Sequence, residues 1–140
     1  MKRLLAVFHV LGFTMALFAT TMFVPMVWSV VLEDGQLMLF IQAFLIALTL
    51  GGAMWAGTRR YRAELRPRDG FLLVTLVWGF LPLLGTIPLL LYFHDIGHPL
   101  KFSDAYFESM SGLTATGATL ICGLDHLAPT INLWRVTMHW

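Results

Sequence analysis

The chain has 140 residues, of which 58% are hydrophobic and only 12% are charged, and its mean hydropathy is +0.75. Soluble domains usually carry about 25% charged residues, so this composition is typical of a membrane protein. The net charge of +1 by itself argues for no nucleic-acid partner, and the single cysteine, Cys122, excludes an internal disulfide and a multi-cysteine zinc site.

Residues 1–57 are predicted to form two leading transmembrane helices. The apolar run from Leu4 to Leu32 is roughly twice as long as the apolar core of a signal peptide, which is about 7–15 residues. We therefore expect a retained helix, which Pro25 kinks or ends. After an acidic turn at 33–35, Gln36–Gly57 is long enough to cross a bilayer core of about 30 Å at about 1.5 Å per residue.

Residues 58–69 contain five arginines and are predicted to form a cytoplasmic loop. Together with Lys2 and Arg3 they place seven of the nine basic residues on one side of the predicted spans. The positive-inside rule then puts the N-terminus and this loop in the cytoplasm. Binding of anionic lipid or of a nucleotide is an alternative use of these arginines, but the topological role is sufficient to explain them. The acidic residues that fall on the opposite, outer side are Glu33, Asp34, Asp95, Asp104, Glu108 and Asp125.

The third predicted span covers Gly70–Phe93. Pro82 and Pro88 lie inside it, so we expect a helix that is bent or locally broken. Carbonyl groups freed by proline need partners in a membrane, which predicts that this helix packs inside a larger bundle.

A short half-polar helix and a run of small residues follow, and we expect the chain to be organised around them. Ser103 is the expected N-cap of a helix over Ser103–Gly112, with Asp104 in the first turn, where the helix dipole favours an anion. Thr114–Thr119 has small side chains throughout, so it offers mainly its backbone. Rows of backbone carbonyls replace the hydration shell of potassium in selective filters. Carbonyls that face one way need unusual dihedral angles at alternate residues, and Gly117 tolerates these at little steric cost.

Residues 120–128 are predicted to be extended chain that returns outward. Pro129 and Thr130 then begin a helix, Ile131–Trp140. Because about 20 residues are needed to cross a bilayer, we expect this sequence to be the N-terminal part of a longer protein.

SGLTATGAT at 111–119, with WRVTMHW at 134–140, resembles the first pore loop of the Trk/Ktr/HKT potassium transporter superfamily, closest to its TrkH branch. The resemblance implies an all-α membrane protein built from transmembrane helices, a re-entrant pore helix and a selectivity-filter loop. Four such helix–pore loop–helix repeats surround one pore in a single chain, and TrkH-type members add two helices before the first repeat. Residues 1–57 would be that extra pair, and 70–140 would be the first repeat, incomplete at its C-terminal end.

The resemblance also implies the site residues. Gly117 maps onto the filter glycine of the family; in related plant proteins a serine there goes with sodium transport, so glycine favours potassium. Ala115 stands where the family commonly has threonine, a change that keeps the carbonyl and removes a hydroxyl. Arg135 matches an arginine at the start of the inner helix and is expected to brace the loop. The backbone expected to hold the transported potassium ion is that of Thr114, Ala115, Thr116, Gly117 and Ala118, and the expected supporting residues are Thr119, Glu108 and Arg135.

The partners implied by the resemblance are those of a bacterial inner-membrane transporter. They are membrane lipid, the remaining three repeats, a second copy of the chain, and a cytoplasmic nucleotide-binding regulatory subunit of the TrkA type.

Two other classes of function compete with transport. The chain could be a structural or partner-binding membrane segment without transport of its own. It could also be a metal-dependent membrane hydrolase, although no helical ligand spacing such as H-E-x-x-H is present and Ser109 and Ser111 lack an adjacent base. The outer-side residues that such an enzyme would use are His94, Asp95, His98, Asp104, Glu108, Asp125 and His126.

Overall fold

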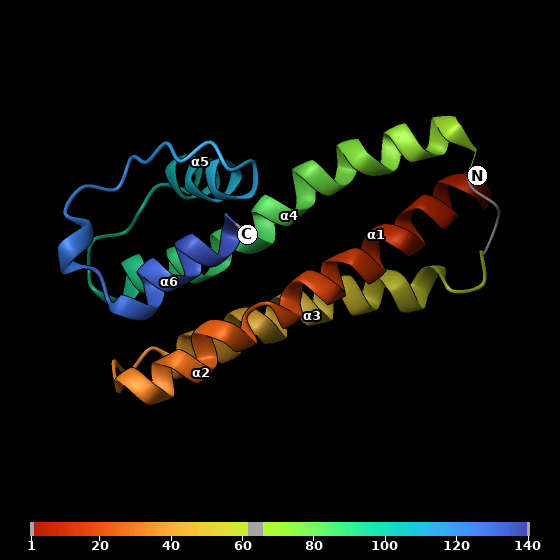
Figure 1. The fold of residues 1–140 in the computed structure, drawn as a ribbon. Coiled ribbons are helices and arrows are strands. Elements are labelled where there is room, and N and C mark those ends of the chain that lie inside the picture. Colours follow the sequence, from red (N-terminus) through yellow and green to blue (C-terminus); the bar gives the residue numbers. More distant parts are fainter. Residues whose placement is uncertain (1, 62–65, 140) are drawn as a thin grey trace.

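The computed structural model describes residues 2–61 and 66–139 (Figure 1). Residues 62–65 of the predicted arginine-rich loop and Trp140 of the predicted last helix lie outside the described residues. The described residues form six α-helices and one 3-10 helix and contain no strand, which confirms the predicted all-α class. Three segments are long and apolar enough to cross a membrane: Arg3–Leu32, Leu37–Thr58 and Pro67–Asp95.

The first span is not one continuous helix. It consists of α1 (Lys2–Thr20) and α2 (Phe23–Leu32), with the break at residues 21–22 and not at Pro25. Pro25 has no N–H for the carbonyl of Thr21, and its ring crowds that carbonyl, so the helix is interrupted four residues before the proline. The N–H groups of Thr21 and Met22 instead bond three residues back, to Phe18 and Ala19.

The second span, α3 (Leu37–Thr58), matches the predicted Gln36–Gly57 to within one residue at each end. It packs antiparallel along α1 (Figure 1). A Cβ atom on Gly12 would lie only 2.6 Å from the backbone nitrogen of Trp55, and one on Gly51 would lie 2.7 Å from that of Ala16. Small residues thus let the two backbones touch, as they commonly do between helices in lipid.

The third span, α4 (Pro67–Asp95), begins three residues before the predicted start. Pro67 occupies the first turn, where its missing N–H costs nothing, and the Asp69 carboxylate accepts the backbone N–H of Arg66 at 2.9 Å. The helix is continuous through Pro82 and Pro88, so of the two predicted outcomes, a bend or a local break, the break does not occur. Neighbours donate to carbonyls near the prolines: the Tyr106 hydroxyl to Gly79 at 3.3 Å and the Trp134 indole to Gly85 at 3.1 Å.

The remaining elements are α5 (Phe102–Leu113), the 3-10 helix η1 (Leu124–His126) and α6 (Pro129–Met138). Ser103 is not the N-cap of α5. Lys101 occupies that position, because its carbonyl already accepts the N–H groups of Asp104 and Ala105. The last helix begins at Pro129, in agreement with the prediction that Pro129 and Thr130 begin it, and Pro129 lies in its first turn.

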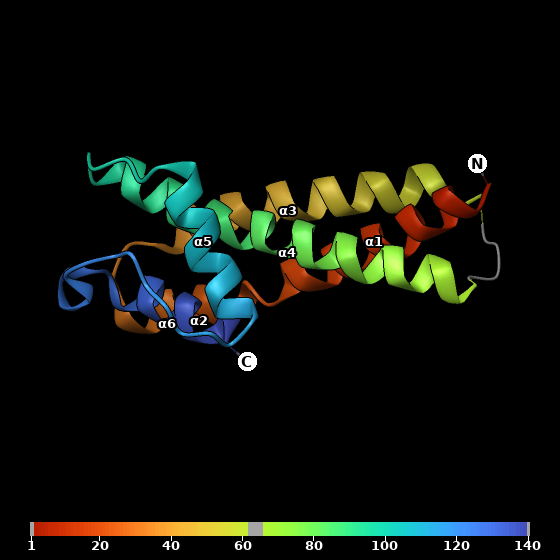
Figure 2. The ribbon, with the colours of Figure 1, turned by 90° about the horizontal axis from the view of Figure 1, so that it is seen from above.

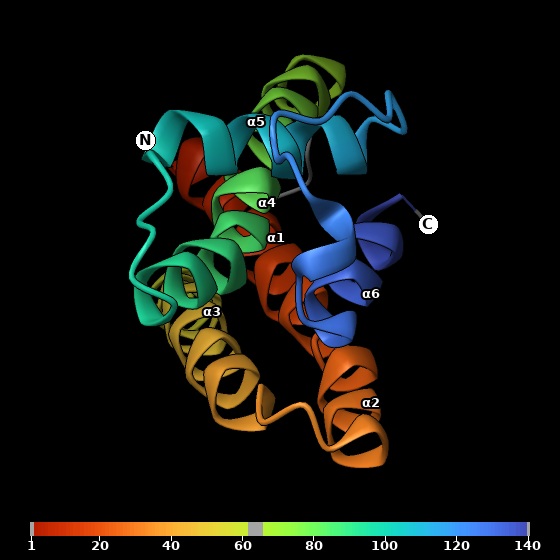
Figure 3. The ribbon, with the colours of Figure 1, turned by 90° about the vertical axis from the view of Figure 1, so that its left-hand side faces the viewer.

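The predicted cytoplasmic segments lie at one end of the molecule and the predicted outer segments lie at the other. The N-terminus, the end of α3 and the start of α4 lie at one end of the molecule, and the turn between α2 and α3 lies at the other, with the end of α4 and with η1 (Figure 1). From that second end the chain enters α5, which crosses α4, and then returns as extended chain to η1 (Figures 1 and 2). Viewed along the bundle, α4 lies between the leading helices and α5, and α6 lies beside α2 (Figure 3). The buried core is continuous from the leading helices to α6, where Trp134 is fully buried.

Candidate functional site

The helix α5 is held against α4 and α6 by buried polar and small residues. The Thr86 hydroxyl of α4 lies 3.2 Å from the Ser109 hydroxyl of α5, and both side chains are fully buried. A Cβ on Gly112 would lie 3.0 Å from that of Met138 in α6, so the two helices meet closely at this point. These contacts fix where the C-terminal end of α5 points.

Residues 114–118 follow α5 with no regular secondary structure and are all exposed. Ala115 has φ of 53° and Gly117 has φ of 75°, so two alternate residues adopt the left-handed conformation. Unusual dihedral angles at alternate residues were predicted for this segment, with Gly117 as the residue that tolerates them. Ala115 has a Cβ atom and adopts the left-handed conformation at a cost of about 1–2 kcal/mol. Among the described residues no donor hydrogen-bonds to the carbonyls of residues 114–117.

The carbonyl of Ala118 differs from those before it. It accepts the hydroxyl of the buried Ser111 at 2.7 Å, so this carbonyl faces α5. The Ser111 carbonyl in turn accepts the N–H of Thr116 at 2.9 Å. Ser111 therefore holds the residues on both sides of Gly117. The sequence did not predict this role of Ser111, because nothing in its type or spacing indicates that the following residues fold back onto it.

The threonine hydroxyls of the loop are used within the protein. Thr114 donates to the Met110 carbonyl at 2.8 Å and lies 2.8 Å from the Thr116 hydroxyl. Thr119 donates to the Glu108 carboxylate at 2.5 Å. Side chains thus stabilise the loop, and the backbone carbonyls of 114–117 are the oxygens left for a ligand.

The three predicted supporting residues meet in one contact behind the loop. The Arg135 guanidinium lies 2.9 Å from Oε1 of Glu108 and donates to the Thr119 hydroxyl at 3.0 Å. The other carboxylate oxygen of Glu108 accepts the N–H of Leu120 at 3.2 Å. The Glu108 side chain is only 2% exposed, so its charge depends on Arg135 for compensation. We call this contact the brace: Glu108, Thr119 and Arg135.

The electrostatics of the loop favour a cation. The C-terminal end of α5, which carries a partial negative charge, lies immediately before Thr114, and the free carbonyls present further partial negative charge. Oxygen atoms of this kind bind hard cations such as the alkali ions, whereas soft transition metals prefer sulfur and imidazole.

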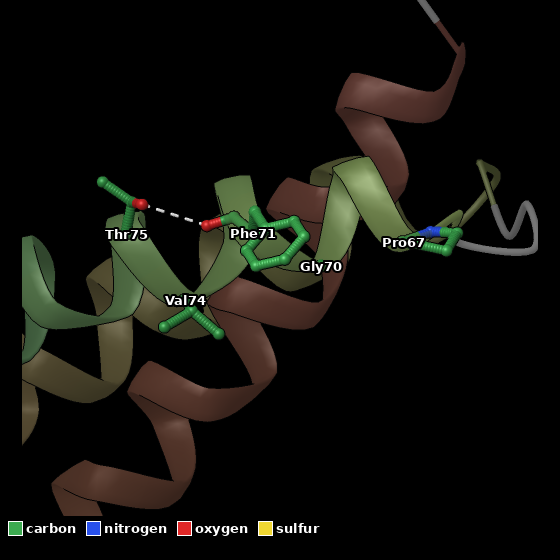
Figure 4. Close-up of a pocket in the computed structure, with 5 residues that line it drawn as sticks. All are labelled: Pro67, Gly70, Phe71, Val74 and Thr75. Carbon is green, nitrogen blue, oxygen red and sulfur yellow. Dashed lines mark hydrogen bonds between the residues drawn. The ribbon is translucent and has the colours of Figure 1, made fainter.

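Other parts of the described chain do not form a comparable ligand site. No group of three or more His, Cys, Asp and Glu residues there lies close enough to hold a metal ion, so the outer-side residues His94, Asp95, His98 and His126 are not brought together into such a site. A hollow at the start of α4 is lined mainly by apolar groups, and the one hydroxyl, that of Thr75, already donates to the Phe71 carbonyl (Figure 4). The hollow is lined by Pro67, Gly70, Phe71, Val74 and Thr75.

Residues 36–140 match the model of a family described as TrkH, cation transport protein. The chain is 38% identical over 135 residues to the Trk system potassium uptake protein TrkH of Salmonella typhimurium, and 40% identical over 134 residues to that of Halomonas elongata. It is 36% identical over 132 residues to the Trk system potassium uptake protein TrkG of Escherichia coli. These matches cover 94–96% of this chain and 27% of each relative, so the chain spans about a quarter of their length.

The fold has a solved counterpart. The crystal structure of the potassium transporter TrkH from Vibrio parahaemolyticus superposes with a TM-score of 0.84 and 37% sequence identity, over 94% of this chain and 27% of that one.

Proposed function

The chain belongs to the TrkH family of cation transport proteins, and we propose that it contributes one of four selectivity-filter loops to a pore for potassium uptake across the bacterial plasma membrane. The observation that carries the proposal is the backbone of residues 114–117. Its carbonyls have no donor among the described residues, and left-handed residues alternate with others along it. Thr114, Ala115, Thr116 and Gly117 would replace water around the ion with these carbonyls.

Ala118 fits this role less well than its neighbours. Its carbonyl accepts the Ser111 hydroxyl, so it would contribute to the site by anchoring the loop more than by ligation. The brace would hold the far end of the loop, through Thr119.

The proposal includes an arrangement in the membrane. Residues 1–57 would be two leading helices, 58–69 would contain the cytoplasmic connection, and the first helix–pore loop–helix repeat would begin with α4. The start of α1, the end of α3 and the start of α4 lie at one end of the molecule (Figure 1), which supports a cytoplasmic position for that end because these segments are rich in arginine. The arginines are Arg3, Arg59, Arg60, Arg66 and Arg68. A full-length protein would supply three further repeats, form a homodimer, and bind a cytoplasmic nucleotide-binding regulatory subunit.

Growth on limiting potassium tests the function. An uptake-deficient bacterium that expresses the protein encoded by the complete gene is expected to grow at potassium concentrations that do not support the parent strain. The 140 residues alone, inserted in the membrane at the same level, are expected not to restore growth, because one loop cannot surround an ion. Failure of the complete protein to restore growth despite membrane insertion would contradict the proposal. Rescue by the 140 residues alone would contradict the single-chain, four-loop arrangement.

Substituting Ser111 by alanine is expected to reduce potassium-over-sodium discrimination in the full-length protein. The change removes the hydroxyl that holds the Ala118 carbonyl, and a lost hydrogen bond of this kind costs about 1 kcal/mol, or roughly fivefold in an equilibrium. Inhibition of rubidium uptake by sodium measures the effect.

Ser109→Ala is the matched control for Ser111→Ala. Ser109 lies on the same helix and is also buried, but its hydroxyl donates to the Ala105 carbonyl and contacts Thr86, away from residues 114–118. Equal changes in discrimination for the two variants would show that Ser111 has no special part in the filter.

A further inference from the structure

Asp34 joins the turn between α2 and α3 to the start of α6, 96 residues further along the chain. Its Oδ2 accepts the backbone N–H of Thr130 at 3.1 Å, while its Oδ1 accepts the Ser29 hydroxyl at 2.6 Å and the N–H of Gln36 at 3.2 Å. The first N–H groups of a helix have no partner within it, and a carboxylate there also meets the positive end of the helix dipole. Asp34 is thus an N-terminal cap of α6 supplied by the leading helices.

The carboxylate is held in its charged form. Burial alone would raise the pKa of Asp34, but the hydrogen bonds from Ser29, Thr130 and Gln36 outweigh burial and hold the pKa below its usual value. The cap therefore carries its charge at neutral pH.

A second contact between the leading helices and α6 lies at Trp134. The indole is fully buried, and its ring meets Phe18 and Phe40 edge-on, with ring centroids 6.0 Å and 6.1 Å apart. Its N–H donates to the Gly85 carbonyl of α4 at 3.1 Å. The helix α6 is therefore held between the leading helices on one side and α4 on the other (Figure 3).

The position of α6 determines whether the brace forms. Arg135 follows Trp134 directly, and its guanidinium reaches Glu108 at 2.9 Å and Thr119 at 3.0 Å. A shift of α6 along its axis would lengthen these hydrogen bonds unless the Arg135 side chain changed its conformation, and a hydrogen bond weakens steeply once the donor and acceptor separate.

We propose that the leading helices α1–α3 are the seat that sets the position of α6, and that Asp34 is the positioning residue through which they act on ion discrimination at residues 114–117. If the leading helices α1–α3 only filled space beside α6, apolar contacts would be sufficient, and no carboxylate would be needed at the first turn of α6. The inference rests on the proposed function, since ion discrimination is one of its two measurements.

The first measurement does not depend on transport. In the purified full-length protein, Asp34→Ala is expected to speed amide hydrogen exchange in the first turn of α6, because the N–H of Thr130 loses its acceptor. Glu33→Ala is the matched control, since Glu33 is the neighbouring carboxylate and is exposed. Unchanged exchange in Asp34→Ala would overturn the seat itself, whether or not the protein transports potassium.

The second measurement is inhibition of rubidium uptake by sodium. Asp34→Ala is expected to lower potassium-over-sodium discrimination about fivefold, the effect of losing a typical helix cap, while Glu33→Ala leaves it unchanged. If Asp34→Ala does not reach the membrane, Asp34→Asn carries the test with a smaller expected loss, because asparagine keeps one acceptor oxygen.

A double variant distinguishes action through the brace from general loosening. Thr119→Val removes one partner of Arg135 and keeps the Glu108–Arg135 ion pair. If Asp34 acts through the brace, the effects of Asp34→Ala and Thr119→Val on discrimination are not additive; additive effects would overturn the proposal. Absence of uptake by the unmodified protein would instead contradict the proposed function and leave the exchange result to decide on the seat.

Discussion

Substituting Gly117 by serine is expected to lower potassium-over-sodium discrimination by roughly tenfold in the full-length protein. Gly117 has φ of 75°, and a residue with a Cβ atom pays about 1–2 kcal/mol for this conformation, where 1.4 kcal/mol corresponds to tenfold. Relaxation of the strain would rotate the peptide groups on either side of residue 117 and change the positions of their carbonyl oxygens. Rubidium uptake in competition with sodium measures the change.

Gly97→Ser controls for the strain. Gly97 has φ of 74° and, like Gly117, has nothing within 4 Å of the position a Cβ would occupy, but it lies in the connection between α4 and α5. Both substitutions thus carry the same backbone penalty. If discrimination were equally reduced in both variants, or unchanged in Gly117→Ser, residues 114–117 would not be the filter.

Replacing Arg135 with glutamine is expected to have the largest effect on stability. It leaves the Glu108 carboxylate, 2% exposed, without its ion-pair partner, and removing one member of a buried pair costs about 3–5 kcal/mol. We expect a lower thermal unfolding temperature of the purified full-length protein in detergent, and loss of uptake, because Thr119 also loses its contact with the guanidinium.

A second neutral substitution tests the cause of that loss. Combining Arg135→Gln with Glu108→Gln removes both charges, so the double variant is expected to recover part of the stability that the single Arg135→Gln variant loses. A double variant less stable than Arg135→Gln would mean that the pair matters for its shape and hydrogen bonds and not for charge compensation.

The long helices could be predicted closely from the sequence, because a span is defined by apolar length. The second span agrees to within one residue at each end. The ends and breaks of helices were less predictable, since they depend on which carbonyl or carboxylate accepts the hydrogen bond of a given backbone N–H. Lys101 is the N-cap of α5, where Ser103 was expected. The helix α4 begins three residues before its predicted start, with the Asp69 carboxylate capping its first turn, and the first span is interrupted at residues 21–22, four residues before Pro25.

The same division holds for the candidate site. Glycine at 117 could be predicted to have a left-handed backbone because its lack of a Cβ is a local property. The brace was expected only from resemblance to a family. The roles of Ser111 and Asp34 could not be predicted, since their partners lie 7 and 96 residues away and are chosen by the packing of α5 and α6. Serine and aspartate at those positions read equally well as ordinary helix and turn residues.

The contact between Gly12 and Gly51 has a consequence for biogenesis. Because α1 and α3 meet backbone to backbone through residues they already contain, all residues of the contact between them are available once residue 58 has left the ribosome. Chains generally fold from the N-terminal part first during synthesis. We therefore expect the seat to assemble before Glu108, Thr119 and Arg135 have been translated, so that α6 packs onto helices that are already in place.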